Sequence, residues 1–245
     1  MSELENHFGE KVAARYDELC SDRFRSDVLD PTVEFLAELA GSGPVLELGV
    51  GTGRVALPLA ERGLQVHGID LSPAMIARLR AKSGSDAIEV TIGDFATTRV
   101  SGSFSLAYLV FNTITNLITQ DAQSGCFANV AEHLQPGGRF VIETSFPARY
   151  LMQPGEMLVP FLVTPTRLGF DEYDVVTQTS ISHHYRVAEG KLDVWSNPHR
   201  YVWPSELDLM ARHAGMVLRE RWETWTREPF TSTSPFHISV WEKTR

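Results

Sequence analysis

Glycine recurs at every second position directly after a short hydrophobic stretch. Residues 45–53 read VLELGVGTG, so Gly49, Gly51 and Gly53 alternate with other residues. Glycine adopts positive φ angles readily and lets a ligand approach the backbone, because it carries no Cβ. The following residues predict a helix to residue 62, and the first N–H groups of a helix have no partner within it. A strand, a glycine turn and a helix N-terminus in this order indicate a nucleotide- or nucleoside-binding site.

An acidic side chain ends the next predicted strand, 65–71. Asp70 follows Gly53 by about 17 residues, close to the spacing at which a carboxylate accepts hydrogen bonds from ribose hydroxyls. The pattern fits more than one class of protein, because Gly51, Gly53 and Ala56 also satisfy the dinucleotide fingerprint G-x-G-x-x-G/A. A nicotinamide-dependent oxidoreductase therefore stays open as an alternative, and so does a tight turn that binds nothing.

The sequence around the turn resembles the class I S-adenosylmethionine-dependent methyltransferases. ELGVGTGR at residues 47–54 matches their cofactor-binding signature [D/E]-x-G-x-G-x-G, and the likeness continues in VHGIDLSPAMI, IGDF and HLQPGGRFVIE. It covers residues 8–145 well and the terminal helix and strands more loosely. The resemblance implies that S-adenosyl-L-methionine is the methyl donor and S-adenosyl-L-homocysteine the product. The roughly forty residues before the first strand also agree with the resemblance, because a dinucleotide-binding domain often begins directly with that strand.

The resemblance assigns five residues to the adenosine end of the cofactor. Asp70 binds the ribose in that family. Leu71 and Met75 flank the adenine, and Asp94 with Phe95 holds the adenine amino group and the ring edge.

Five further residues are assigned to the turn and to the methionine end of the cofactor. Gly49, Gly51 and Gly53 allow the cofactor to approach the backbone. Asn112, which follows the fourth predicted strand, lies near the methionine part, and Glu47 orients that region through backbone N–H groups or water.

Three side chains are candidates for a role in the chemical step. Methyl transfer from a sulfonium is an in-line displacement, so the enzyme must mainly align the reactants and exclude water. His183 and His184 are adjacent on a predicted strand, so only one can face a cleft and serve there as a general base near neutral pH. Tyr16 lies in a helical segment that, in related enzymes, closes over the methionine end. The structural alternative for His183 and His184 is packing within the strand, and for Tyr16 it is anchoring of the helix to the core.

Strands and helices alternate between residues 45 and 145, which predicts a doubly wound, Rossmann-like α/β fold with a mostly parallel sheet. The helix before it is expected to begin at Asp30-Pro31, and Pro58 is expected to bend the helix after the turn. The predicted strands are 45–48, 65–71, 87–92, 104–111 and 139–144, with a helix over 122–134.

The pattern becomes β-rich after residue 145, with strands expected over 158–163, 174–187 and 191–203. We expect this excursion to form a lid over the acceptor site. The last two strands, 216–225 and 236–241, must pair antiparallel, because the link between them is too short for a helical crossover. We therefore predict one domain with four parts, namely a helical cap (1–43), a cofactor-binding core (44–150), a β-rich lid insertion (151–203) and a terminal helix with strands (204–245).

The composition is that of an acidic globular protein. The chain has 245 residues and a formal net charge of −9, which argues against a nucleic-acid partner because phosphate binding needs a basic surface. It contains no run of about 18 apolar residues, so no membrane partner is expected. The N-terminus lacks the basic start and apolar stretch of a secretory signal, and a cytoplasmic enzyme with two reduced cysteines fits best.

The acceptor is expected to be a small molecule or a peptide. We favour N-methylation over O-methylation, because no convincing general base stands out. No H-E-x-x-H or C-x-x-C motif is present, so no metal is expected. A binding protein that keeps the nucleoside pocket without chemistry is a third option. The sequence leaves the oligomeric state open, with a homodimer as one possibility.

Overall fold

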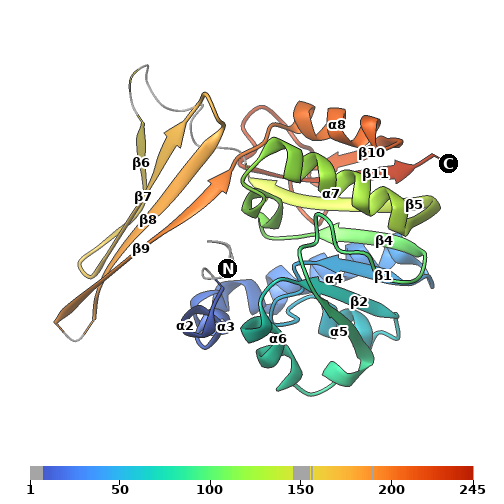
Figure 1. Cartoon of the computed structure of the whole chain (residues 1–245), viewed down its shortest axis with the longest axis horizontal. Helices are drawn as coiled ribbons and strands as arrows, with labels where there is room; N and C mark the ends of the chain where they lie inside the picture. The colour runs from blue at the N-terminus through green and yellow to red at the C-terminus, as the bar shows by residue number, and fades with distance from the viewer. Residues whose placement is uncertain (1–7, 146–154, 156, 189, 245) are drawn as a thin grey trace.

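Two separate β-sheets make up the protein (Figure 1). The computed structural model describes residues 8–145, 155, 157–188 and 190–244. The large sheet carries helices on both faces, and the small antiparallel sheet projects from one end of it (Figure 1). This arrangement confirms the predicted fold class, a doubly wound α/β fold with a β-rich insertion.

The large sheet has seven strands in the order β10-β11-β5-β4-β1-β2-β3. Strands β1 to β5 run parallel, while β11 pairs antiparallel with both β5 and β10, as the short link predicted. The strand order reverses between β1 and β4, which places the ligand crevice of such folds at their carboxyl ends. The bounds are β1 Val45–Leu48, β2 Val66–Asp70, β3 Ile88–Ile92, β4 Phe104–Leu109, β5 Leu134–Ser145, β10 Met216–Trp222 and β11 Phe236–Lys243.

Apolar helix faces build a core layer on each side of the large sheet. On one side α4, α5 and α6 pack through residues such as Leu36, Leu59 and Leu79. On the other side α7 and α8 pack through residues such as Phe127 and Met210. The longer helices are α4 Ser26–Ala40, α5 Ala56–Glu61, α6 Pro73–Arg80, α7 Gln120–His133 and α8 Pro204–His213. The short ones are α2 Glu10–Ala13, α3 Tyr16–Leu19, η1 Ser21–Phe24, η2 Ser85–Ala87 and η3 Thr113–Asn116.

Two expectations about proline are wrong. Helix α4 begins at Ser26 and includes Pro31 in its interior, because Leu29 packs against the core and makes an earlier helical turn favourable. Pro58 does not sit inside a continuing helix. It is the third residue of α5, where the N–H group has no intrahelical partner to lose.

The small sheet consists of β6 Leu158–Thr164, β7 Arg167–Asp174, β8 Thr179–Ala188 and β9 Lys191–Arg200, paired antiparallel in that order. The excursion is β-rich as predicted, but the sequence reading missed β7 as a strand of its own. The expected start of the lid, residue 151, lies outside the described residues. Most of the exposed large apolar side chains of the described chain belong to this sheet and its connections.

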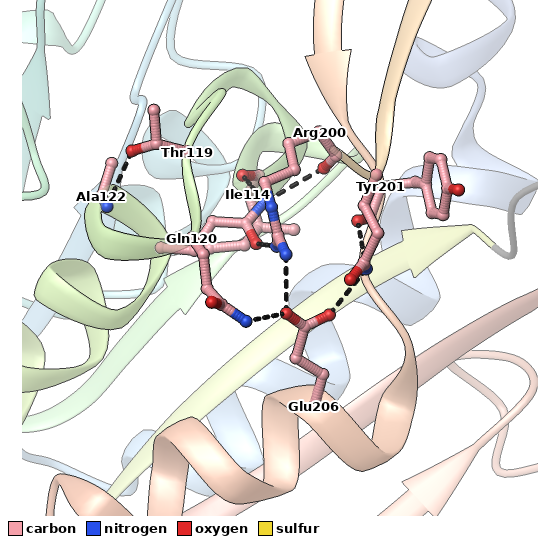
Figure 2. A network of polar contacts seen from close by, with 9 residues as sticks. Ile114, Thr119, Gln120, Ala122, Arg200, Tyr201 and Glu206 are labelled. Carbon is pink, nitrogen blue, oxygen red and sulfur yellow. Dashed lines mark hydrogen bonds and ion pairs between the residues drawn. The ribbon is translucent and has the colours of Figure 1, made fainter. Parts of the chain in front are cut away.

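A buried polar network ties the small sheet to the core (Figure 2). Arg200, the last residue of β9, donates from Nη2 to Oε1 of Glu206 in α8 at 2.7 Å. Gln120 and Gln178 donate to the same carboxylate at 2.8 and 2.9 Å. Burial raises the pKa of Glu206, but the hydrogen bonds from Arg200, Gln178 and Gln120 outweigh it and leave the pKa below its ordinary value. Gln123 in α7 completes the network by donating to the Arg200 carbonyl at 3.0 Å.

Candidate active site

A cavity of about 250 Å³ opens at the carboxyl ends of the parallel strands. Its lining comes from the segments that follow β1, β2, β3 and β4 and from the N-terminal residues. These residues are Phe8, Tyr16, Gly49, Gly51, Asp70, Leu71, Ser72, Met75, Asp94, Phe95, Thr113, Asn116 and Leu117. Seven of the ten residues that the sequence assigned to the cofactor therefore meet in one place.

Asp70 is fixed by the backbone on both sides. Its Oδ2 accepts a hydrogen bond from Gly51 N at 2.7 Å, and its Oδ1 accepts one from Ser72 N at 2.8 Å. Burial raises the pKa of Asp70 above its ordinary value, and the two N–H donors oppose this rise. A carboxylate oxygen can accept more than one hydrogen bond, so each oxygen keeps capacity for a further donor. The arrangement suits a ligand with two neighbouring hydroxyl groups.

The three glycines of the turn have different reasons to lack a side chain. All have positive φ angles, +74° at Gly49, +54° at Gly51 and +81° at Gly53. A Cβ on Gly51 would lie no closer than 3.4 Å to the Met75 methyl group, so this residue presents its backbone to the cavity. A Cβ on Gly53 would lie 2.3 Å from Leu79 Cδ1. Gly53 is therefore needed for packing against α6, and the described lining of the cavity does not include it.

The far wall of the cavity is built after β2 and β3. Met75 is held in the first turn of α6 because Ser72 Oγ accepts a hydrogen bond from Met75 N at 3.1 Å. Asp94 turns the chain after β3, with Oδ1 accepting from Ala96 N at 2.8 Å. Together with Leu71 and Phe95, these residues give this end of the cavity apolar surfaces and one carboxylate.

The N-terminal segment covers the cavity. Phe8 and Tyr16 line it directly, and Ser72 Oγ donates to the Phe8 carbonyl at 2.6 Å. Asp17 docks the same segment on the glycine turn, because its Oδ1 accepts from Thr52 Oγ1 at 2.6 Å. Burial raises the pKa of the Tyr16 phenol far above its usual value, so Tyr16 stays protonated near neutral pH. A protonated phenol can donate a hydrogen bond to a ligand in the cavity.

Glu47 lies beneath the turn and does not line the cavity. Its side chain is buried, and Oε2 accepts a hydrogen bond from the Tyr108 hydroxyl at 2.7 Å. Burial raises the pKa of Glu47 to about 8, although the Tyr108 hydrogen bond opposes the rise. Glu47 acts on the cavity only through the strand and turn that it supports.

The segment after β4 is strained and clamped by β5. Phe111 and Asn112 both have positive φ angles, 57° and 60°, which are unfavourable for residues with a Cβ. Glu143 accepts from Phe111 N at 2.7 Å, and Asn112 Oδ1 accepts from Ser145 N at 2.6 Å. The sequence reading missed Glu143, whose signal was an acidic residue inside an otherwise apolar strand. Asn112 lines a second cavity of about 190 Å³ and not the first.

The structure brings neither His183 nor His184 to either cavity. His183 Nε2 lies 3.1 Å from Glu172 Oε2, and its Nδ1 lies 2.8 Å from Ser196 Oγ. His184 stacks on Trp195 with ring centroids 4.9 Å apart, and burial lowers its pKa. The His183–Glu172 pair has the composition of a general base with an orienting carboxylate. It belongs, however, to the face of the small sheet opposite the residues that line the second cavity.

Residues 8–145, 155, 157–188 and 190–244 hold no group of three or more His, Cys, Asp or Glu side chains that could bind a metal ion. Within those ranges no helix is long and apolar enough to span a membrane. Cys20 and Cys126 are both free thiols.

A parallel sheet with reversed strand order, a glycine turn open to a cavity and a carboxylate after the next strand define a nucleoside-binding α/β protein. Residues 45–138 match the family described as "Methyltransferase domain". Among solved structures, the CcbJ methyltransferase from Streptomyces caelestis is 35% identical, with a TM-score of 0.79, over 88% of this chain and 89% of that one.

Two further comparisons extend over nearly the whole chain. The cypemycin N-terminal methyltransferase from a Streptomyces species is 26% identical over 93% of this chain and 97% of its own. The S-adenosylmethionine-bound structure of CalS10 from Micromonospora echinaspora shares the fold, with a TM-score of 0.72 and 20% identity over 94% and 96% of the two chains.

The chain belongs to the class I S-adenosylmethionine-dependent methyltransferases. It is an enzyme, and S-adenosylmethionine is its methyl donor. This membership decides between the two enzyme classes that the glycine turn left open.

Proposed function

We propose that this enzyme transfers a methyl group to an amino group of a small molecule or peptide. The observation that carries the proposal is the extent of the match to the cypemycin N-terminal methyltransferase, a protein named for methylating an amino terminus. That match covers 93% of this chain, so it includes the small sheet as well as the cofactor-binding core. CalS10, described as an amino pentose methyltransferase, shares the fold over 94% of this chain.

We assign the methyl donor to the cavity of 250 Å³. The free accepting capacity of Asp70 suits the ribose, and Leu71, Met75 and Phe95 offer apolar surfaces to the adenine. Gly51 supports the assignment, since a larger side chain there would project into the cavity. Asp94 is the residue that can accept from the adenine amino group.

The protein has to align and desolvate the reactants in such a reaction. When bound, S-adenosylmethionine supplies an electrophilic methyl group, and the new N–C bond forms while the C–S electron pair stays on sulfur. The acceptor must offer a free lone pair, so its ammonium form loses a proton to solvent beforehand. Phe8 and Tyr16 limit the access of water from the N-terminal side, and the backbone donors at Asp70 fix the carboxylate that orients the ribose.

An amine acceptor suits a methyl-donor cavity without an evident base, although His199 and Asp171 line the neighbouring second cavity. Within the described residues, the lining of the first cavity includes no histidine, and Tyr16 stays protonated near neutral pH. We therefore propose that His183 and His184 are dispensable for the chemical step.

The test uses S-adenosylmethionine with a deuterated methyl group and matched pairs of acceptors that differ only in bearing an amine or a hydroxyl. Tandem mass spectrometry should locate the label on nitrogen. The rate should rise with pH along the ionisation of the amine. His183→Ala and His184→Ala should each lower kcat less than about tenfold, whereas a general base contributes typically 10²–10⁴-fold. Label on oxygen, or a hundredfold loss with unchanged cofactor affinity, would favour base-assisted O-methylation.

A further inference from the structure

The second cavity lies between the core and the small sheet, and every described residue that lines it carries a polar side chain. The core side provides Asn112, Thr115 and Ser145, and the small sheet provides hydroxyl groups such as those of Ser180 and Ser182. Small-molecule pockets are usually lined mainly by apolar and aromatic side chains. A ligand that fits here must therefore be able to form hydrogen bonds on most of its surface.

Asp171 provides a carboxylate in this cavity. Its Oδ1 accepts from Ser182 Oγ at 2.5 Å, and its Oδ2 accepts from the Tyr173 hydroxyl at 3.3 Å. No ion pair joins it to a lysine or arginine of the described chain; the acidic ion-pair partners on β7 and α8 are Glu172, Glu206 and Asp208. A carboxylate that is held by hydroxyl groups keeps its charge available for a cationic ligand.

The second cavity borders the methyl-donor cavity along one short helix. Thr113 and Asn116 of η3 line the first cavity. Asn112, which precedes η3, and Thr115 within it line the second. The two cavities therefore adjoin along residues 112–116, and the strained backbone at Asn112 stands at their boundary.

We propose that the second cavity binds the methyl acceptor, and that the acceptor is a compact polyhydroxylated amine. Its ammonium form pairs with Asp171 on binding and releases a proton to solvent before the amine accepts the methyl group. The inference rests on the proposed N-methylation and narrows its substrate class. Hydroxyl groups of such a ligand find partners on both walls, in Thr115 of the core and Ser180 of the small sheet. A peptide with aliphatic side chains finds no aliphatic residue among the described lining residues, where only the rings of Tyr173 and Tyr201 offer extended apolar surface.

The test measures binding by saturation-transfer NMR, with the enzyme saturated with S-adenosylhomocysteine. The probes are glucosamine, glucose as the matched polyol without an amine, and trialanine as a peptide amine. Glucosamine should bind more tightly than the other two. Asp171→Asn should weaken glucosamine binding by about tenfold or more, the scale of one charge-assisted hydrogen bond. Glucose binding should hardly change in this variant.

Two further variants make the result decisive. Asp193→Asn removes a charge from an exposed position on the same sheet and should leave the affinity for glucosamine unchanged. Thr115→Val tests the core wall and should weaken glucosamine binding several-fold, which keeps the inference testable if Asp171→Asn fails to fold in a thermal melt.

The inference is overturned if glucosamine does not bind the parent enzyme, or if trialanine binds as tightly as glucosamine. It is also overturned if neither Asp171→Asn nor Thr115→Val weakens the binding of glucosamine. Because these readouts do not involve turnover, methyl transfer to oxygen would contradict the proposed function and leave the acceptor pocket standing.

Discussion

Glu47 is a buried carboxyl group that should make the stability of the enzyme depend on pH. Its pKa is raised from 4.5 to about 8 in the folded protein. A carboxyl group whose pKa is raised by folding stabilises the folded state fully at pH values below its pKa in the unfolded chain. This contribution is lost as the pH rises through its pKa in the folded protein. The free energy of unfolding should therefore fall between these two values, at up to about 1.4 kcal/mol per pH unit from this group.

Glu47→Gln isolates this contribution, because the amide cannot titrate and its oxygen can still accept from Tyr108. Urea unfolding at about pH 5.5 and about pH 7.5 should show a smaller loss of stability in the variant than in the parent. Equal losses in the two proteins would mean that Glu47 is already ionised in the folded state.

At the scale of single residues, the sequence predicted which residues meet at one cavity but not the reason for every position in it. Asp70, Met75 and Phe95 could be placed because the carboxyl ends of parallel strands meet at one edge. The packing role of Gly53 could not be predicted, since its closeness to α6 depends on how two helices pack and the glycine spacing does not reveal it. Glu143 was missed because its hydrogen-bond partner is the backbone N–H of Phe111. The positive φ angle of Phe111, which the sequence does not reveal, is part of the geometry of this contact.

The junction between the small sheet and the core depends on one ion pair. Arg200 and Glu206 have side chains that are only 4% and 13% exposed. Removing one member of such a pair leaves a buried charge without compensation, so Glu206→Gln should lower the free energy of unfolding by about 3 kcal/mol. Hydrogen exchange should also speed up in β9.

Glu38→Gln is the matched control for this junction. It breaks the ion pair with Arg227, whose side chains are 62% and 36% exposed, and exposed pairs contribute at most about 1 kcal/mol. Equal effects of the two substitutions on urea unfolding would show that the junction does not depend on the Arg200–Glu206 pair.

At the scale of elements, the strands of the core could be predicted and those of the insertion only in part. The buried strands β1 and β4 are short, mostly apolar runs bounded by turn residues, which is a strong local signal. Strand β7 reads RLGFDEYD, and its acidic residues hide the alternation because both faces of the small sheet carry polar groups. The start of α4 was predicted too late in the chain. Asp30-Pro31 has the sequence of a capped helix start, although Pro31 is the sixth residue of the helix.

The whole molecule presents an apolar surface that an isolated copy leaves exposed. Val163, Leu168 and Val194 are paired across the small sheet on the face opposite the second cavity, with exposed fractions of 73, 42 and 54%. Four strands of this length offer about 500 Å² on one face, which also carries the His183–Glu172 pair, so two copies would bury about 1,000 Å², the least area expected of a biological interface. We predict a homodimer through this face.

Light scattering after size exclusion should give the mass of a dimer for the parent enzyme. Val163→Lys combined with Leu192→Lys should shift the equilibrium to the monomer, because both residues lie on that face. Val176→Lys, in the β7–β8 connection and 89% exposed, should leave the dimer intact. A parent that stays monomeric at high micromolar concentration, or a dimer that survives the double substitution, would contradict the prediction.

The assignment of the methyl donor to the cavity at Asp70 underlies every other proposal, and calorimetry with S-adenosylhomocysteine tests it most directly. Asp70→Asn places an amide N–H₂ against the N–H of either Gly51 or Ser72 and removes the charge that accepts from the ribose. The affinity should fall at least tenfold, since charge-assisted hydrogen bonds contribute about 1.5–3 kcal/mol each. Asp86→Asn, an exposed position in η2, should bind like the parent. An affinity of folded Asp70→Asn within about threefold of the parent would remove Asp70, and with it this cavity, from the cofactor site.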